Sequence, residues 1–251
     1  MRILITNDDG IEAAGIKLLE RVARTLSRDV WVVAPEAEQS GASHSLTLTE
    51  PLRIRKLTTR KFAVRGTPTD SVMMAVNQLV PGKRPDLVLA GVNRGGNLGE
   101  DVTYSGTIAA AMEGTLLKLP SIALSQTMRF GHPVKWATAE QHAPVIIRRL
   151  LDVGWPAGVL INVNFPDVSH DAVAGIAVAA QGQRDLSDLV IDSRVDTRGV
   201  AYHWIGFRRQ VGAPSPETDL AAVAQGRIAI TPLQLNLTHH DVLENLRKGL
   251  M

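Results

Sequence analysis

The sequence predicts an α/β fold with a mostly parallel sheet. An apolar strand over 2–6, an amphipathic helix over 11–26 and a second apolar strand over 30–35 follow one another with short joints. This order implies two parallel strands joined by a right-handed crossover. The alternation of strands and helices then continues to about residue 166. The 251-residue chain, 45% hydrophobic and 21% charged, can therefore form a Rossmann-like three-layer sandwich with a core of ordinary size.

Each early element has its own signal. The first helix is predicted from the helical spacing of its apolar residues, which are Ile11, Ile16, Leu18, Leu19, Val22 and Leu26. Residues 46–65 alternate apolar and polar side chains, which predicts a half-exposed hairpin. Thr67, Pro68 and Asp70 form a capping box with proline at the first helical position, so a helix is expected to begin there.

The later elements follow the same logic. They are strands over 86–91, 121–125 and 158–166 and helices over 105–118 and 139–154. From about residue 170 the sequence changes: 182–199 is polar and rich in turn formers, 201–207 and 226–238 are predicted strands, and a short helix ends the chain. We therefore expect an α/β core over 1–170. Residues 171–251 are expected to be a C-terminal extension with a protruding hairpin and a terminal helix, used for oligomerisation and not an independent domain.

Composition excludes several classes of protein. Lys and Arg number 27 and Asp and Glu 25, a net charge of +2 that favours neither a nucleic-acid polymer nor a membrane surface as partner. The absence of cysteine excludes disulfides, thiolate catalysis and thiolate metal sites. No apolar run approaches the roughly 18 residues of a membrane span, and the N-terminus has no secretory pattern. A cytoplasmic protein is the expectation.

Polar clusters follow three predicted strands. They are Asn7 to Gly10 after the first, Ser40, Gly41, Ser43 and Ser45 after the second, and Asn93, Asn97, Ser105 and Thr107 after the third. Ligands of open α/β sheets bind at the carboxyl ends of the strands. The three clusters are therefore expected to share one crevice.

The chemistry of these clusters suggests a metal beside an anion. The neighbouring carboxylates of Asp8 and Asp9 repel each other unless a cation lies near, and carboxylate, hydroxyl and amide oxygens suit Mg²⁺, Mn²⁺ or Ca²⁺. Residues 105–107 open a helix, whose N–H groups favour phosphate. This arrangement is typical of metal-assisted phosphoryl hydrolysis. By itself, however, "NDDG" is more often a simple turn.

Five segments carry a family resemblance. In chain order they are "NDDG", "VVAPEAEQSGASHSLTL", "GTPTDSV", "GVNRGGNLGEDVTYSGTIAAAMEG" and "ITPL". Together they resemble SurE, a family of metal-dependent nucleoside monophosphate phosphatases, over nearly the whole chain. The resemblance implies that the metal ligands are Asp8, Asp9, Ser40 and Asn93. It also implies that the phosphate or substrate site includes Asn97, Ser105, Gly106, Thr107, Gly41 and His44, with His44 standing where members often carry Asn.

The resemblance implies an activity and an assembly as well. We expect hydrolysis of nucleoside 5′- and 3′-monophosphates, some cleavage of short polyphosphate, one Mg²⁺ or Mn²⁺ per subunit, and a homodimer or homotetramer. In the hypothesised mechanism water attacks directly, and either Asp8 or Asp9 accepts its proton. The sequence does not choose between the two aspartates.

The sequence argues against several alternatives. A phospho-receiver, a cation-binding signalling module without hydrolase activity, also has an acidic pair after its first strand, but the third strand here ends without the required aspartate. An aspartyl-phosphate intermediate would need D-x-D-x-T, which "NDDG" does not match. A dinucleotide site would need G-x-G-x-x-G, which does not follow the first strand. The histidines form no zinc pattern. Trp136 and Trp204 are expected to be packing residues, and Arg129 and His132 could border a nucleoside.

Overall fold

The computed structural model describes residues 1–183, 189–207 and 214–251 and confirms the α/β class. In these residues the main sheet has nine strands in the order β3-β4-β2-β1-β5-β6-β7-β11-β8. The pairs β3–β4 and β7–β11 are antiparallel and the other neighbours are parallel. The strands are β1 (Arg2–Thr6), β2 (Asp29–Pro35), β3 (Arg53–Thr58), β4 (Lys61–Arg65), β5 (Leu87–Arg94), β6 (Ser121–Gln126), β7 (Val159–Phe165), β8 (Ile176–Val178) and β11 (Ile228–Gln234).

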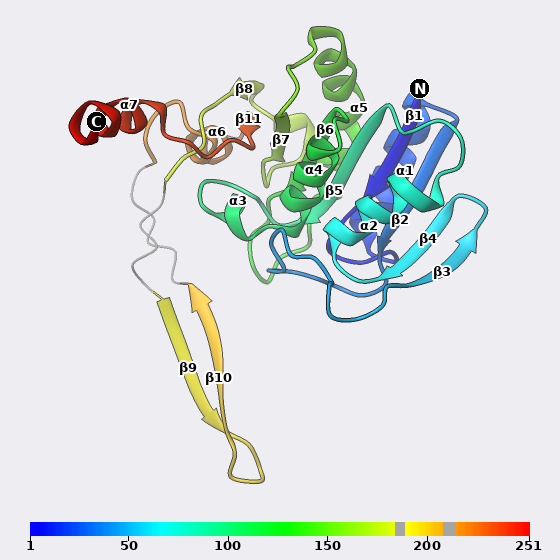
Figure 1. The fold of residues 1–251 in the computed structure, drawn as a ribbon, viewed down its shortest axis with the longest axis horizontal. Coiled ribbons are helices and arrows are strands. Elements are labelled where there is room, and N and C mark those ends of the chain that lie inside the picture. Colours follow the sequence, from blue (N-terminus) through cyan, green and yellow to red (C-terminus); the bar gives the residue numbers. More distant parts are fainter. Residues whose placement is uncertain (184–188, 208–213) are drawn as a thin grey trace.

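Helices cover both faces of the sheet (Figure 1). They are α1 (Ala14–Leu26), α2 (Pro68–Met74), α3 (Asp101–Tyr104), α4 (Gly106–Leu116), α5 (Trp136–Val153), α6 (Asp219–Ala224) and α7 (His240–Leu250), with a π-helix η1 (Ala75–Leu79) and a 3₁₀ turn η2 (His170–Ala172). Strand side chains alternate between the two faces. Ile3 and Ile5 accordingly pack with α1 and α5, whereas Leu4 packs with α2 and α4. This gives the predicted three layers.

The capping box at the start of α2 is confirmed. The backbone N–H of Asp70 donates to Thr67 Oγ1 at 3.1 Å, and the N–H of Thr67 donates to Asp70 Oδ2 at 2.8 Å. The carboxylate of Asp70 also accepts from the backbone N–H of Thr47 at 3.1 Å. Asp70 therefore joins the loop before β3 to the helix, in the structural role that the sequence predicted.

Strand β5 runs further than predicted, and Asn93 lies within it instead of in the following loop. Its register against β6 shifts between Ala90 and Asn93. Gly91 has φ +130°, and a Cβ atom there would lie 2.2 Å from the carbonyl oxygen of Leu124. Only glycine fits so close to the neighbouring strand. After this shift in register β5 continues to Arg94, beyond residue 91 where the sequence predicted its end.

The C-terminal region contains more regular structure than expected. Strands β8 and β11 complete the main sheet, and β9 (Leu189–Val195) pairs with β10 (Ala201–Phe207) as an antiparallel hairpin. Strand β9 was not predicted, because 182–199 is polar and rich in turn formers. Neither face of the hairpin is covered by the main sheet. The division at residue 170 remains a prediction, since strands on both sides of it share one sheet.

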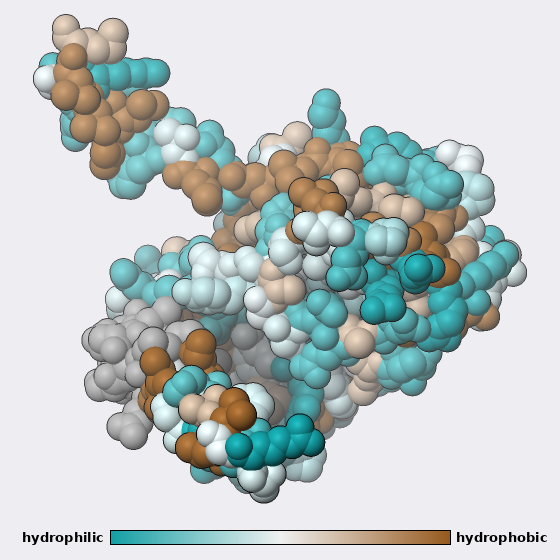
Figure 2. All heavy atoms as spheres, turned by 60° about the horizontal axis from the view of Figure 1, so that its bottom comes forward, coloured by the Kyte–Doolittle hydropathy of each residue, from teal (hydrophilic) through white to brown (hydrophobic). Residues whose placement is uncertain are grey.

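The hairpin and the terminal helix both project from the sheet (Figure 1). Apolar side chains gather on the projecting helix α7 (Figure 2), where Leu246 is 53% and Leu250 82% exposed. On the hairpin, Trp204 is 63% exposed, so it is not a packing residue within this chain, and it lies in the region expected to mediate assembly. Trp136, in contrast, packs against the core as expected. In the described part of the chain no helix is long and apolar enough to cross a membrane.

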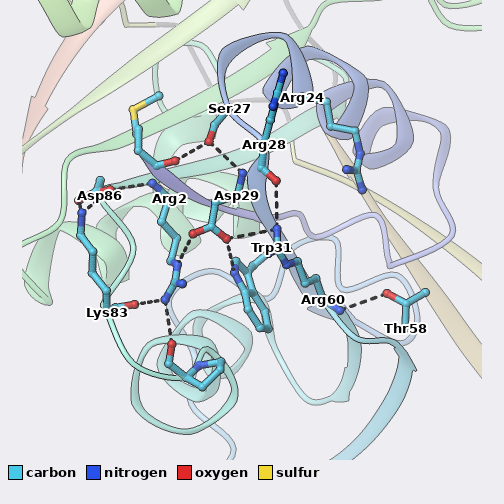
Figure 3. A network of polar contacts seen from close by, with 12 residues as sticks. Arg2, Arg24, Ser27, Arg28, Asp29, Trp31, Thr58, Arg60, Lys83 and Asp86 are labelled. Carbon is cyan, nitrogen blue, oxygen red and sulfur yellow. Dashed lines mark hydrogen bonds and ion pairs between the residues drawn. The ribbon is translucent and has the colours of Figure 1, made fainter.

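A polar network joins the amino ends of β1 and β2 (Figure 3). Arg2 Nε donates to Asp29 Oδ2 at 2.7 Å, and Trp31 Nε1 donates to the other oxygen of Asp29 at 2.9 Å. The guanidinium carbons of Arg2 and Arg60 each lie 5.7 Å from the centre of the Trp31 ring. Arg2 lowers the pKa of Asp29. The network stabilises the amino ends of the strands and leaves the carboxyl ends to the candidate site.

Candidate active site

The loop after β1 turns sharply and meets the loop after β2. Asn7 Nδ2 donates to the carbonyl oxygen of Gly10 at 2.8 Å, and Gly10 has φ +99°. The backbone N–H of Gln39 donates to the carbonyl oxygen of Asp8 at 2.7 Å. The structure thus brings two of the three predicted clusters together at the carboxyl edge of the sheet.

Asp8 lies against the start of α4. It is only 4% exposed, and its Oδ1 accepts a short hydrogen bond from the hydroxyl of Thr107. A Cβ atom on Gly106 would lie 2.8 Å from Asp8 Cβ and 3.0 Å from Asp8 Oδ2. A glycine at the first position of α4 is therefore what allows the carboxylate to approach the helix so closely.

Asp9 lies on the other side of the turn, against the end of β5. Its Oδ2 accepts from the backbone N–H of Arg94 at 3.1 Å. With Glu38, Ser40 and Arg94 it lines a hollow of about 250 Å³. The third cluster is thus joined to the first two, and Asp9, Ser40 and the residue after Asn93 border the same space.

The electrostatics of the aspartate pair favour a cation. Burial raises the pKa of Asp8, against the lowering effect of the Thr107 hydroxyl. Burial, and then the charge of Asp8, raise the pKa of Asp9 to about 6. Glu38 raises both pKa values further. Among the ion pairs between described residues, none includes Asp8 or Asp9.

The donor atoms fit a hard divalent cation. No three His, Cys, Asp or Glu side chains of the described residues gather as a metal cluster, so a metal here would rely on the two aspartates and neutral oxygens. Mg²⁺ commonly binds through one or two carboxylates, with water completing its shell. Ser40 Oγ now donates to Glu38 at 2.8 Å, and Asn93 Nδ2 donates to the carbonyl oxygen of Gly95 at 3.0 Å. The oxygens of both side chains are suitable ligand types.

The start of α4 supplies the candidate anion site. Ser105 is its N-cap, and Ser105 Oγ accepts from the backbone N–H of Ile108 at 3.1 Å. The eleven-residue helix directs its amino end, which carries the positive end of the helix dipole, toward this edge of the sheet. Because Asp8 touches Gly106 and Thr107, the anion site and the aspartate pair are neighbours.

Asn97 is held by buried side chains of β6 and β7. Its N–H donates to Asn164 Oδ1 at 2.8 Å, and its carbonyl oxygen accepts from Asn162 Nδ2 at 2.8 Å. Its side-chain Nδ2 donates to Ser125 Oγ at 2.8 Å. Ser125, Asn162 and Asn164 are fully buried. Sequence reasoning missed these three residues, although two buried polar residues within an otherwise apolar strand were a visible signal.

The remaining predicted residues lie further out. His44 Nε2 is 3.1 Å from Glu113 Oε2, about two helical turns along α4 from Gly106. Gly41 is exposed, with φ +77° and open space around it. Arg129 and His132 are both exposed. Roles for these four residues in substrate binding stay predictions.

Comparison with known proteins decides the family. A family model described as "Survival protein SurE" matches residues 3–188. The chain belongs to the SurE family.

Relatives in the SurE family match the chain along its length. A protein of Paramagnetospirillum magneticum named "5'-nucleotidase SurE" is 61% identical over 246 residues, covering 98% of this chain and 94% of that protein. One of the same name from Parvibaculum lavamentivorans is 56% identical over 252 residues, 100% of this chain and 91% of that protein. The crystal structure of the SurE protein from Aquifex aeolicus superimposes with a TM-score of 0.86 at 37% identity, covering both chains completely.

Proposed function

We propose that this protein is a divalent-metal-dependent phosphomonoesterase that hydrolyses nucleoside 5′- and 3′-monophosphates to nucleoside and phosphate. The observation that carries the proposal is the position of the aspartate pair. Asp8 and Asp9 have raised pKa values and form no ion pair among the described residues. Asp8 touches the start of α4, and Asp9 touches the end of β5. Relatives named 5'-nucleotidase SurE, identical at more than half of the aligned positions, support the substrate class.

Asp8, Asp9, Ser40 and Asn93 would hold the cation, with Mg²⁺ or Mn²⁺ the metals that suit this donor set. When bound, such a cation supplies Lewis-acid stabilisation of the phosphoryl group. The chain itself then has two tasks. It must orient the phosphate, and it must accept the proton of the attacking water.

Asp9 is the better candidate for the proton acceptor. Asp8 is almost completely buried and its Oδ1 is occupied by the Thr107 hydroxyl, whereas Asp9 lines the hollow. In the metal-free protein the pKa of Asp9 is about 6, so this carboxylate is ionised at neutral pH, and a bound cation would lower the pKa.

The start of α4 and Asn97 would bind the phosphoryl oxygens. Ser105 caps the helix and so fixes its first turn, and the positive end of the helix dipole favours an anion there. Asn97 has one side-chain N–H bonded to Ser125, and its second N–H is the donor for the substrate. Charge that redistributes during phosphoryl transfer is stabilised by these fixed donors.

The test is phosphate release from a panel of 5′- and 3′-nucleoside monophosphates with Mg²⁺, with Mn²⁺ and with EDTA. We expect release that EDTA abolishes and added cation restores. Asp9→Asn should lose nearly all activity while remaining folded, and Asp152→Asn, which alters an exposed aspartate of α5, should retain it. Full turnover by Asp9→Asn would refute the metal site, and no release by the wild type with any metal would refute the proposed function.

Two further properties belong to the proposal. Short polyphosphate presents the same terminal phosphoryl group and should be a second substrate in the same assay. The exposed apolar residues of the β9–β10 hairpin and α7, among them Ile191, Trp204, Ile205, Leu246 and Leu250, support a homodimer or homotetramer assembled through the C-terminal region.

A further inference from the structure

A buried aspartate of the C-terminal region contacts the loop that carries Asn97. Asp219, the first residue of α6, is fully buried. Its Oδ2 accepts from the backbone N–H of Gly99 at 2.9 Å, and its Oδ1 accepts from the backbone N–H of Gly182 at 2.8 Å. The single carboxylate therefore bridges two segments of the chain that are 83 residues apart in sequence (182 minus 99).

The backbones at Gly99 and Gly182 lie close together, with little space for a side chain at either position. A Cβ atom on Gly99 would be 3.2 Å from the carbonyl oxygen of Gly182, and one on Gly182 would be 2.8 Å from Asp219 Oδ1. Gln181 adds a bond from its Nε2 to the carbonyl oxygen of Gly99 at 3.0 Å. Both backbone polar groups of Gly99 are thus engaged by residues from beyond position 170.

The loop from Gly95 to Gly99 is therefore held at two places by different parts of the chain. Asn97, at its centre, is fixed by Ser125, Asn162 and Asn164. Its end, Gly99, is fixed by Asp219 and Gln181. Because both carboxylate oxygens of Asp219 accept backbone N–H groups, this side chain fixes the end of the loop relative to Gly182.

Asp219 also marks the base of the hairpin. Gly182 precedes and Asp219 follows the segment that contains β9 and β10. The base of the projecting hairpin and the substrate loop are consequently joined through the side chains of Asp219 and Gln181. A displacement at the base would move Gly99, two residues from Asn97.

We propose that Asp219 is a positioning residue for the reaction, because its carboxylate bonds to Gly99 and Gly182 hold the Asn97 loop in the geometry that binds the phosphoryl group. The inference rests on the proposed function, in which Asn97 donates to that group. It makes the C-terminal region necessary for catalysis within each chain, in addition to any part it takes in assembly.

The test variant is Asp219→Asn. It keeps the size of the side chain but replaces one accepting oxygen by an NH₂ group, which faces a backbone N–H and cannot accept from it. A misplacement of about 1 Å at a catalytic group costs about 10²-fold in rate. We therefore expect kcat/KM to fall between about tenfold and a hundredfold.

The fall should be the same for a nucleotide and for p-nitrophenyl phosphate, because Asn97 contacts the phosphoryl group that both share. Mn²⁺ binding, measured by titration, should be unchanged. A merely structural role would lower the melting temperature and leave kcat/KM of the folded protein intact. The matched control is Asp196→Asn in the hairpin, since Asp196 Oδ1 also accepts from two backbone N–H groups, those of Arg198 and Val200 at 2.8 and 2.9 Å. Its kcat/KM should match the wild type.

The outcomes separate this inference from the proposed function. A folded Asp219→Asn protein within twofold of an active wild type would overturn the positioning role and leave the proposed function standing. An inactive wild type would overturn both. If Asp219→Asn fails to fold, Gln181→Ala decides, because it removes only the bond to the Gly99 carbonyl. A loss of about two- to fivefold with an unchanged melting temperature would support the role, and an unchanged kcat/KM would overturn it.

Discussion

Replacing Gly106 by alanine tests how closely Asp8 is held against α4. The added Cβ atom would lie 2.8 Å from Asp8 Cβ, 3.0 Å from Asp8 Oδ2 and 3.1 Å from Pro68 Cγ. Non-bonded carbon atoms prefer about 3.5–4.0 Å, so Asp8 or the helix must retreat by about 0.7 Å. Asp8 is buried and bonded to Thr107, so this displacement moves the aspartate that the proposal assigns to the cation.

Two opposing effects set the stability of Gly106→Ala. Alanine is favoured over glycine in a helix by about 1 kcal/mol, whereas overpacking a filled site costs about 1–3 kcal/mol. The net loss should therefore be about 0–2 kcal/mol, small enough for the variant to fold. Its activity should suffer more, because a shift of most of an ångström at a catalytic group costs about tenfold to a hundredfold in kcat/KM.

The assay measures phosphate release as a function of Mg²⁺ concentration, together with thermal unfolding. The matched control is Gly249→Ala in α7, where a Cβ atom would meet nothing within 4 Å. That variant should be as active as the wild type and should gain up to about 1 kcal/mol. A Gly106→Ala protein within twofold of the wild type at every Mg²⁺ concentration would refute the close packing of Asp8 on α4 as a requirement for metal binding.

Three other predictions follow from the same structure. Because burial and Asp8 raise the pKa of Asp9 to about 6, above its unfolded value of about 3.9, the metal-free protein binds this proton more tightly when folded. It should lose stability as pH rises from about 4 to 6. Mg²⁺ should then raise the melting temperature more at pH 8 than at pH 5, and an equal rise at both would contradict the raised pKa. Gly91→Ala should abolish folding or cost more than about 3 kcal/mol, because its Cβ atom would lie 2.2 Å from the Leu124 carbonyl oxygen. Gly82→Ala, with φ +73° and open space, should cost about 1–2 kcal/mol. Urea unfolding of both variants measures the two costs, and similar values would refute the steric explanation. Trp204→Arg should shift light-scattering mass toward the monomer if the hairpin mediates assembly, and an unchanged mass would exclude Trp204 from the contact.

Short-range sequence patterns predicted much of the fold and the loops that carry the aspartate pair and the start of α4. The strand before Asn7, the capping box at Thr67 and the helix start at Ser105 all rest on residues within a few positions of one another. The rule that ligands bind at the carboxyl edge of the sheet then brought three separate loops together. The contacts of Asp9 with Arg94 and of Asp8 with Thr107 agree with that expectation.

Long-range contacts explain what the sequence alone did not reveal. Asn162 and Asn164 contact Asn97 across 65 and 67 residues, and Asp219 contacts Gly99 across 120. No spacing or periodicity encodes such pairs. Strand β9 was missed for a different reason. The polar, turn-forming residues of 182–199 mask Ile191 and Val195, the apolar side chains that share one face of this strand.

Anomalous diffraction from crystals of the protein grown with Mn²⁺ would show directly whether a cation binds at the Asp8–Asp9 pair. We expect one strong peak per chain bounded by carboxylate oxygens of Asp8 and Asp9 at about 2.0–2.3 Å, with oxygens of Ser40 and Asn93 nearby. A crystal with Mn²⁺ bound elsewhere, or with no peak at the aspartate pair under conditions that support phosphate release, would contradict it.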